Sequence, residues 1–247
     1  MNNEKNFNLK FIRDKILPGL TKNNKDLALD EFSRPLTKYI DRISKIGLVN
    51  HSNGLDAGCG LGNWTIPLAM LNSNVIGIDF DFNKIKAAKK IAKNMSINNV
   101  KFVEGHLTDL PFKNNEFDFI ICYSVIMYTN PEKVLKEFIR VLSTNGKLYI
   151  MTDLWRWLLI PPNKRLFDLF IYWFNLIILR LKGVKYKFFT KRSFEKMLER
   201  KGFVIVSKGQ DGESSFINKK VKSNIKGFYP KFKDGYEYLW EVCAYKK

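Results

Sequence analysis

Three glycines that alternate with other residues, Gly58, Gly60 and Gly62, lie between a short apolar run and a helical pattern. Glycine permits a tight backbone turn and a close approach of the backbone to a ligand. An acidic residue, Asp79, ends the next predicted strand, 21 residues after Gly58. A carboxylate in that place can accept hydrogen bonds from both hydroxyls of a ribose held over the loop. The spacing therefore predicts a ligand that contains a ribose.

The chemistry of the rest of this ligand follows from two further positions around the loop. A loop that binds a pyrophosphate has the pattern Gly-x-Gly-x-x-Gly, and here Asn63 takes the place of the third glycine. Asp56 stands two residues before Gly58, where its negative charge would repel a pyrophosphate. The same charge suits a ligand with a positive amino group and a sulfonium. A glycine-rich turn without a ligand is the alternative interpretation.

The loop and four later segments resemble a single family, in the same order along the chain. Residues Asp56–Gly62 resemble motif I of the class I S-adenosylmethionine-dependent methyltransferases. The further matches are Val75–Asp79, Glu104–Phe112, Phe117–Cys122 and Leu135–Leu148. The resemblance is strongest to the type 11 group, which includes ubiquinone and menaquinone methyltransferases, and it covers roughly residues 50–152.

This resemblance implies that the cofactor is S-adenosyl-L-methionine and that particular residues bind it. The glycines would lie under its methionine part, Asp79 would bind the ribose, and His106 and Leu107 would lie beside the adenine. The expected cofactor-binding residues are Asp56, Gly58, Cys59, Gly60, Gly62, Asp79, Phe80, His106, Leu107 and Cys122. Family members commonly carry Asp where His106 stands, and a neutral imidazole can also accept a hydrogen bond from an adenine amino group. The alternative for His106 is a surface-loop histidine.

The elements that would position these residues follow from the alternation of short apolar runs and amphipathic stretches. Strands are predicted at 54–57, 74–79, 100–104, 117–123, 146–152, 203–206 and 236–245. Helices are predicted at 27–48, 64–71, 83–95, 131–142 and 190–201. This order predicts an α/β fold with a doubly wound parallel sheet. The resemblance implies a Rossmann-like sheet of seven strands whose last strand is antiparallel.

Three parts are expected along the chain. Residues 1–50 form an N-terminal helical cap, and residues 51–247 form a class I methyltransferase domain with an insertion at 154–189. Within the insertion, Leu169–Leu179 holds no charge over 11 residues, which is short of the ~20 that a membrane span needs. Such an apolar helix must be covered by a core or dimer contact, by a substrate over which it forms a lid, or by a membrane surface.

Catalysis by such a protein needs few dedicated groups. Methyl transfer from a sulfonium mainly requires proximity and alignment, and a base is needed only for a poorly acidic hydroxyl. Tyr123, after the fourth strand, and Asp153, at the end of the fifth, are the candidate catalytic residues. Their alternative roles are core packing and a helix cap. Cys122 lies in an apolar strand and is interpreted as a buried, inert thiol, and His51 as a loop residue.

Composition limits the remaining functions. The net charge is +18, and residues 161–247 hold 20 Lys and Arg against 8 Asp and Glu. This basic, aromatic third favours an RNA methyltransferase as one alternative, and a non-catalytic cofactor-binding subunit is another. In the family that the chain resembles, substrate-specific insertions often follow the fifth strand, so for this apolar insertion the resemblance implies a small, apolar, aromatic or lipid-like acceptor. Three scattered cysteines and two histidines predict a cytoplasmic protein without a metal site, with peripheral membrane contact as an option.

Overall fold

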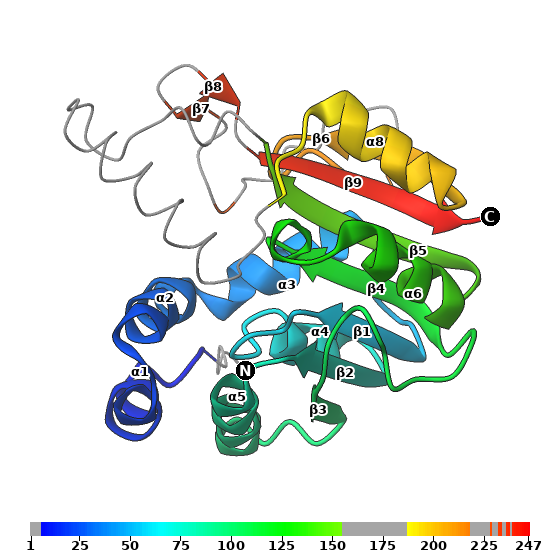
Figure 1. Cartoon of the computed structure of the whole chain (residues 1–247). Coiled ribbons are helices and arrows are strands. Elements are labelled where there is room, and N and C mark those ends of the chain that lie inside the picture. The colour runs from blue at the N-terminus through cyan, green and yellow to red at the C-terminus, as the bar shows by residue number, and fades with distance from the viewer. Residues whose placement is uncertain (1–5, 155–186, 218–227, 229–231, 234–235, 238) are drawn as a thin grey trace.

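The computed structural model describes residues 6–154, 187–217, 228, 232–233, 236–237 and 239–247. Its centre is a twisted β-sheet with helices on both faces (Figure 1). The apolar segment 169–179 lies outside the described residues. Its three interpretations, as a lid, a membrane contact or a core helix, therefore remain predictions.

The sheet has seven strands in the order β3-β2-β1-β4-β5-β9-β6. Their bounds are β1 Asn53–Ala57, β2 Asn74–Asp79, β3 Val100–Glu104, β4 Phe117–Tyr123, β5 Leu142–Asp153, β6 Phe203–Gly209 and β9 Leu239–Lys246. The first five pair in parallel, whereas β9 is antiparallel to both of its neighbours, β5 and β6. This confirms the expected seven-stranded sheet with an antiparallel last strand.

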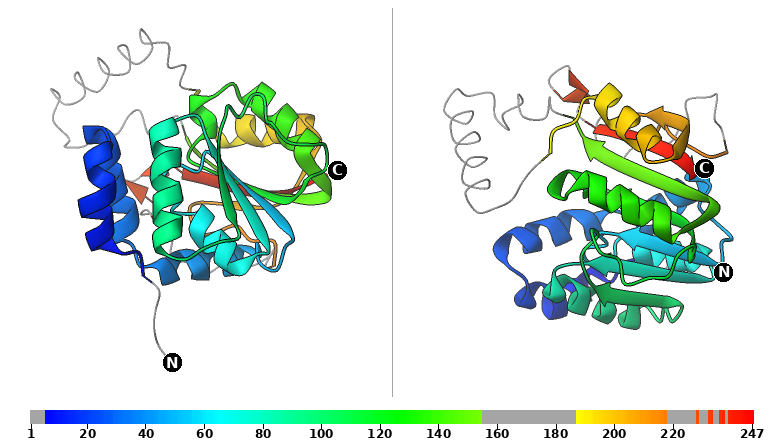
Figure 2. Two further views of the ribbon diagram at one scale, coloured as in Figure 1. Left: turned by 90° about the horizontal axis from the view of Figure 1, so that it is seen from below. Right: turned by 45° about the vertical axis from the view of Figure 1, so that its right-hand side comes forward.

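The helices form two layers on this sheet, as the views in Figure 2 show. The bounds of the helical elements are α1 Leu9–Phe11, η1 Ile12–Ile16, η2 Leu17–Gly19, α2 Lys22–Ser33, α3 Leu36–Ile46, α4 Thr65–Leu71, α5 Phe82–Asn94, η3 Ile126–Tyr128, α6 Pro131–Val141 and α8 Lys191–Arg200. Successive side chains of β4 point to opposite faces of the sheet and belong to two separate hydrophobic cores. Phe119 and Ile121 pack with α3, α4 and α5 in one core, and Ile120 and Cys122 pack with α6 and α8 in the other.

The N-terminal helical segment differs from its prediction. The apolar spacing predicts one helix over 27–48, but the structure has two, α2 and α3, separated at Arg34 and Pro35. Proline cannot donate a backbone hydrogen bond and forces the preceding residue out of the helical region, and Arg34 is accordingly extended with ψ 134°. The predicted end at Gly47 is confirmed, with the glycine left-handed at φ 92°.

Three strand boundaries also differ, and the simplest difference is that β6 ends at Gly209 rather than at residue 206. Strand β5 starts at Leu142 rather than at residue 146, because Leu142 pairs with Phe117 across a register shift in β4. The predicted strand at 236–245 is divided into β8 (Tyr236–Glu237) and β9, and β8 forms a separate two-stranded sheet with β7 (Phe232–Lys233). None of the helices in the described part of the chain is both long and apolar enough to cross a bilayer.

Candidate functional site

The glycine loop after β1 is held against the end of β2. The backbone N–H groups of Gly58 and Cys59 both donate to the carbonyl oxygen of Ile78, at 2.8 and 2.9 Å. Gly58 has φ +86°, and a Cβ built there would lie 2.4 Å from a methyl carbon of Val125. Gly60 has φ +53°, and a Cβ there would meet nothing within 4 Å. Gly58 is therefore required by packing, whereas Gly60 faces open space above the loop.

Asp79 joins this loop to the second strand. One carboxylate oxygen accepts from the N–H of Gly60 at 3.0 Å, and the other accepts from the N–H of Asp81 at 3.0 Å. The side chain is 7% exposed. The two features that the sequence analysis expected to work together, a carboxylate and a glycine bend, are thus in direct contact. Each oxygen retains lone pairs for a further donor such as a ribose hydroxyl.

Asp56 places a second carboxylate beneath the loop. It is buried and accepts a hydrogen bond from the hydroxyl of Thr65 at 2.6 Å. Burial is the main cause that raises the pKa of Asp56 to about 7, and the negative charge of Asp79 acts in the same direction. A positively charged ligand would offset both effects, so this environment suits a cation rather than a phosphate.

Helix α2 brings further polar groups close to the residues around Asp79 and Asp56, which the sequence analysis did not anticipate. The side-chain amide of Asn24 lies 3.5 Å from a carboxylate oxygen of Asp81, just after Asp79. Burial raises the pKa of Glu31 to about 7, partly offset by Arg34 and Lys84, and the charge of Asp56 raises it slightly further. The N-terminal helices therefore contribute to the same acidic surroundings as Asp56.

Two rings lie at the outer end of the site. Phe80 directly follows Asp79 and is 67% exposed. Its ring is nearly parallel to the imidazole of His106, with an interplanar angle of 13° and ring centroids 6.2 Å apart. Leu107 is buried beside them. Exposed, nearly parallel rings offer faces on which a flat heterocycle can stack.

The two cysteines assigned to the cofactor site are both buried, Cys59 in the loop and Cys122 in β4. Burial raises the pKa of each thiol well above its usual range. They therefore stay protonated and offer no nucleophile. Because Cys122 is fully buried with its side chain in the core, a contact of its side chain with the cofactor remains only a prediction.

The two candidate catalytic residues lie at the carboxyl ends of neighbouring strands. Tyr123 ends β4 and is half-buried, with its ring 4.8 Å from that of Trp64, which follows the glycine loop. Asp153 ends β5, and its charge raises the pKa of Tyr128, to which burial contributes more. The segment that Asp153 would cap as a helix lies outside the described residues. His51 lies apart from the site, at the amino end of β1, where Lys147 Nζ is 3.2 Å from its Nε2.

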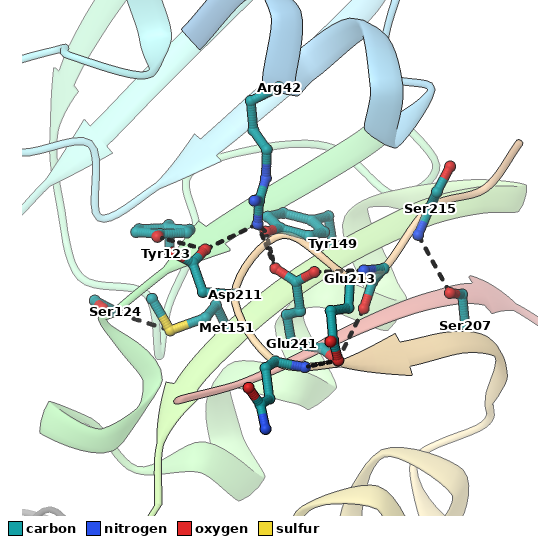
Figure 3. A network of polar contacts seen from close by, with 12 residues as sticks. Arg42, Tyr123, Ser124, Tyr149, Met151, Ser207, Asp211, Glu213, Ser215 and Glu241 are labelled. Atoms are coloured by element: carbon teal, nitrogen blue, oxygen red, sulfur yellow. Dashed lines mark hydrogen bonds and ion pairs between the residues drawn. The ribbon is translucent and has the colours of Figure 1, made fainter. Parts of the chain in front are cut away.

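A buried polar network behind Tyr123 has no counterpart in the sequence analysis (Figure 3). One terminal nitrogen of Arg42, on α3, donates to Tyr149 Oη at 2.7 Å, to Asp211 Oδ1 at 2.9 Å and to Glu241. Tyr123 donates its hydroxyl proton to the same Asp211 oxygen at 3.1 Å. The available signal was Arg42 itself, a charge on the apolar face of α3 that is otherwise formed by Tyr39, Ile43 and Ile46.

The site meets the requirements of S-adenosylmethionine on three counts. Gly60 faces open space, the Asp79 carboxylate contacts the loop there, and Asp56 supplies a buried carboxylate whose ionised form a positive amino group would stabilise. Among the described residues, no group of three or more His, Cys, Asp or Glu could hold a metal ion.

The strand order with β9 inserted antiparallel, together with a glycine loop facing the acidic end of β2, defines the class I methyltransferases. Residues 48–208 match the family model described as a methyltransferase domain, and the chain therefore belongs to this family.

The curated relatives named here each match less than half of the chain. A demethylmenaquinone methyltransferase of Staphylococcus carnosus is 39% identical over 99 residues, which are 38% of this chain and 40% of that protein. Another, of Geobacillus sp., is 31% identical over 121 residues, which are 47% of this chain and 52% of that protein. The chain thus spans about half the length of the curated relatives that it matches.

Solved structures match almost the whole chain at low identity. A geranyl diphosphate C-methyltransferase of Streptomyces coelicolor has a TM-score of 0.64 and 15% identity, covering 98% of this chain and 88% of that one. A SAM-dependent methyltransferase of Aquifex aeolicus has a TM-score of 0.58 and 17% identity, covering 91% and 97%. Such likeness establishes the shared fold.

Proposed function

We propose that this protein transfers a methyl group from S-adenosylmethionine to a small acceptor that carries an apolar aromatic or lipid-like group. The binding of this methyl donor is supported by the contact of the Asp79 carboxylate with the N–H of Gly60, a residue that faces open space. Bound S-adenosylmethionine supplies an electrophilic methyl group on a sulfonium.

Each donor-side residue then has a distinct task. Asp79 accepts hydrogen bonds from the ribose hydroxyls while its contact with Gly60 keeps the loop closed. Asp56, oriented by Thr65, attracts the positive amino group. Phe80 and His106 present ring faces to the adenine. Since the leaving thioether is a good leaving group, these contacts act chiefly by fixing the direction of the methyl group.

The proposed class of methyl acceptor is supported by the aromatic rings beside the glycine loop, residues 58–62, which we call the donor loop because it would hold the methyl donor. Trp64 contacts Tyr123 at 4.8 Å and Phe228 at 5.3 Å between ring centroids, and Tyr123 and Phe228 are 6.2 Å apart. These three rings come from the segment after the donor loop, the end of β4 and the C-terminal region. Tyr123 and Phe228 are partly exposed, and their rings offer an aromatic surface that suits an apolar, ring-bearing acceptor. The relatives named demethylmenaquinone methyltransferase support the same class of acceptor.

The cellular setting is part of this proposal. We infer a cytoplasmic enzyme that meets its apolar acceptor in solution or at a membrane surface. RNA as the acceptor has weaker support, because it rests on the basic C-terminal third alone.

The test combines a binding measurement with a transfer measurement. Calorimetry with S-adenosylmethionine and S-adenosylhomocysteine reports on the donor site. Transfer of a labelled methyl group is then compared for a prenylated naphthol, the same naphthol without its prenyl chain, and a total RNA preparation. We expect binding of both donor ligands and preferential labelling of the prenylated compound.

The controls separate the two halves of the proposal. Loss of labelling in Asp79→Ala would assign the transfer to this site rather than to a contaminant. Labelling of RNA in preference to both naphthols would contradict the proposed acceptor. Absence of binding to both donor ligands would contradict the proposal as a whole.

A further inference from the structure

Helix α2, in the N-terminal segment, lies against the start of α5. The side-chain amide of Asn24 on α2 is 3.5 Å from a carboxylate oxygen of Asp81, the N-cap of α5. Glu31 follows Asn24 by about two helical turns, so both side chains are on the same face of α2. This face is therefore the one that α2 presents to the segment after Asp79.

A second set of contacts places Glu31 beside the donor loop. The hydroxyl of Tyr39, on α3, donates to the backbone carbonyl of Glu31 at 3.0 Å. The ring of Tyr39 lies edge-on against Trp64, which follows the donor loop, with ring centroids 5.5 Å apart. Burial is the main cause that raises the pKa of Glu31, and the charge of Asp56 adds to it, so the two carboxylates are close enough to interact. Glu31 thus adjoins the acid beneath the loop.

The carboxylate of Glu31 has few partners of its own. Within the described part of the chain it forms no hydrogen bond and no ion pair, and Arg34, three residues later, forms an ion pair with Asp30. Burial raises its pKa to about 7, and the charges of Arg34 and Lys84 offset this only in part. The residue is partly exposed, so a ligand can reach it. Such a carboxylate favours a cationic ligand.

We infer that Glu31 binds the positive amino group of S-adenosylmethionine together with Asp56. The inference rests on the proposed function and makes helix α2 part of the cofactor site. Gly60, which faces open space, belongs to the same loop as the residues that Asp56 supports. The N-terminal helices then serve donor binding as well as the stability of the sheet domain.

The charges of the two acids match this ligand. Asp56 also has a pKa of about 7, mainly because of burial, so each acid loses charge readily in the free protein. An ammonium group near both offsets the desolvation of each carboxylate and the repulsion between them, whereas an anionic group would add to that repulsion. The pair of Glu31 and Asp56 therefore selects a cation more strongly than Asp56 alone.

The contacts of Glu31 could also serve stability alone, so the test must separate binding from packing. Glu31→Gln keeps the shape of the side chain and removes its charge. Asp30→Asn is the matched control, because it removes a negative charge from the same turn of α2, but from an exposed side chain that pairs with Arg34. Thermal unfolding establishes that both variants are folded.

The binding measurement uses two ligands that differ in one group. Calorimetry at pH 8 compares S-adenosylhomocysteine with its deamino derivative, in which hydrogen replaces the amino group. We expect Glu31→Gln to bind S-adenosylhomocysteine at least about tenfold more weakly, as for the loss of a hydrogen bond between charged groups. The affinity for the deamino derivative should change by less than about twofold. Asp30→Asn should leave both affinities within about twofold of the wild type.

Unfolding without ligand provides a second readout. The charged groups that face Glu31 are Arg34 and Asp30 from α2, Lys84 from α5 and Asp56 from β1. Because burial raises the folded-state pKa of Glu31 above its ordinary value of 4.5, this carboxylate lowers stability as pH rises through that range to about 7. In urea unfolding, Glu31→Gln should therefore gain stability relative to the wild type between pH 5 and pH 8. A structural residue would instead lose stability on replacement.

Three results would overturn the inference. They are wild-type affinity of Glu31→Gln for S-adenosylhomocysteine, an equal loss of affinity for both ligands, and a loss of stability at pH 8 without any loss of affinity. In each case, binding of S-adenosylhomocysteine by the wild-type protein would still support the proposed methyl donor. Absence of that binding would contradict both the inference and the proposed function.

Discussion

Arg42, near the start of the sequence, and Glu241, near its end, form an ion pair inside the protein across 199 positions. Their side chains are 1% and 0% exposed. Glu241 is further held by Tyr149 and by the backbone N–H of Ser214. The pair connects α3 directly with β9, the strand between β5 and β6. This N-terminal helix therefore packs into the interior of the sheet domain.

Removal of Arg42 should be strongly destabilising. Arg42→Ala leaves two carboxylates, Asp211 and Glu241, buried without their cation, and we expect a loss of about 3–5 kcal/mol in the free energy of unfolding. Burial already raises the pKa of Glu241, and loss of Arg42 removes the charge that opposes this effect, so the folded state binds more protons than the unfolded state and stability falls as pH rises. Urea unfolding at pH 5 and pH 8 measures this. Lys45→Ala, which breaks an exposed pair with Asp41, should change stability by less than ~1 kcal/mol.

Asp79→Ala should abolish tight cofactor binding while the protein stays folded. Hydrogen bonds to a charged group contribute about 1.5–3 kcal/mol each, so loss of two ribose contacts should weaken binding by at least about a hundredfold. Asp118→Ala is the matched control, because Asp118 also accepts two backbone N–H groups, from Ser52 and Asn53, but at the opposite end of the sheet. Equal affinities of the two variants in calorimetry would refute the ribose assignment.

Two glycine variants should separate stability from binding. Gly58→Ala combines a left-handed backbone with a 2.4 Å clash against Val125, and we expect a loss of about 3 kcal/mol in stability. Gly60→Ala meets no atom within 4 Å and should cost only about 1–2 kcal/mol of backbone strain. Its methyl group enters the ligand space, so S-adenosylmethionine should bind more weakly. Unfolding and calorimetry on both variants check this, and a Gly60→Ala protein with wild-type affinity would contradict it.

Cofactor affinity should depend on pH through Asp56. Its pKa of about 7 in the free protein means that the carboxylate is mostly neutral at pH 6 and mostly charged at pH 8. Because the positive amino group selects the charged form, affinity for S-adenosylhomocysteine should rise about tenfold from pH 6 to pH 8. Asp56→Asn should flatten this rise and bind more weakly at pH 8. Any slope that remains in the variant is assigned to Glu31, whose pKa is also about 7.

Phe80 should contribute to affinity through stacking. Phe80→Ala removes one of the two nearly parallel rings, and stacking of a base on an aromatic ring is worth ~1–3 kcal/mol, so the affinity should fall about fivefold or more. Phe82→Ala serves as the control, because Phe82 is also exposed, at 57%, and lies only two residues away. A comparable loss in both variants would show that the effect comes from the first turn of α5 rather than from the ring.

The meeting of the glycine loop with Asp79 could be predicted because both are fixed by local chain geometry. A loop that leaves β1 and a carboxylate that ends β2 must meet when the two strands pair in parallel, and the contact of Gly60 with Asp79 follows. The N-cap of α5 is equally local, since Asp81 accepts from the N–H groups of Asn83 and Lys84 within its own turn.

The network behind Tyr123 could not be predicted, because it depends on which strands become neighbours. Arg42, Asp211 and Glu241 meet only when β9 has entered the sheet beside β5 and α3 has packed over it. Apolar periodicity carries no information on such distant pairing. The break between α2 and α3, in contrast, is caused locally by Pro35. The prediction of a single helix used apolar spacing alone and did not take this proline into account.

The position of β9 has a consequence for biosynthesis. Residues 239–246 leave the ribosome after the other six strands of this sheet, yet they occupy an interior place in it. Until they emerge, β5 has one open edge and β6 has no neighbour, so the nascent chain carries unpaired N–H and C=O groups prone to intermolecular pairing. Premature termination before residue 239 should therefore yield an aggregating fragment, even though every donor-loop residue has already been made.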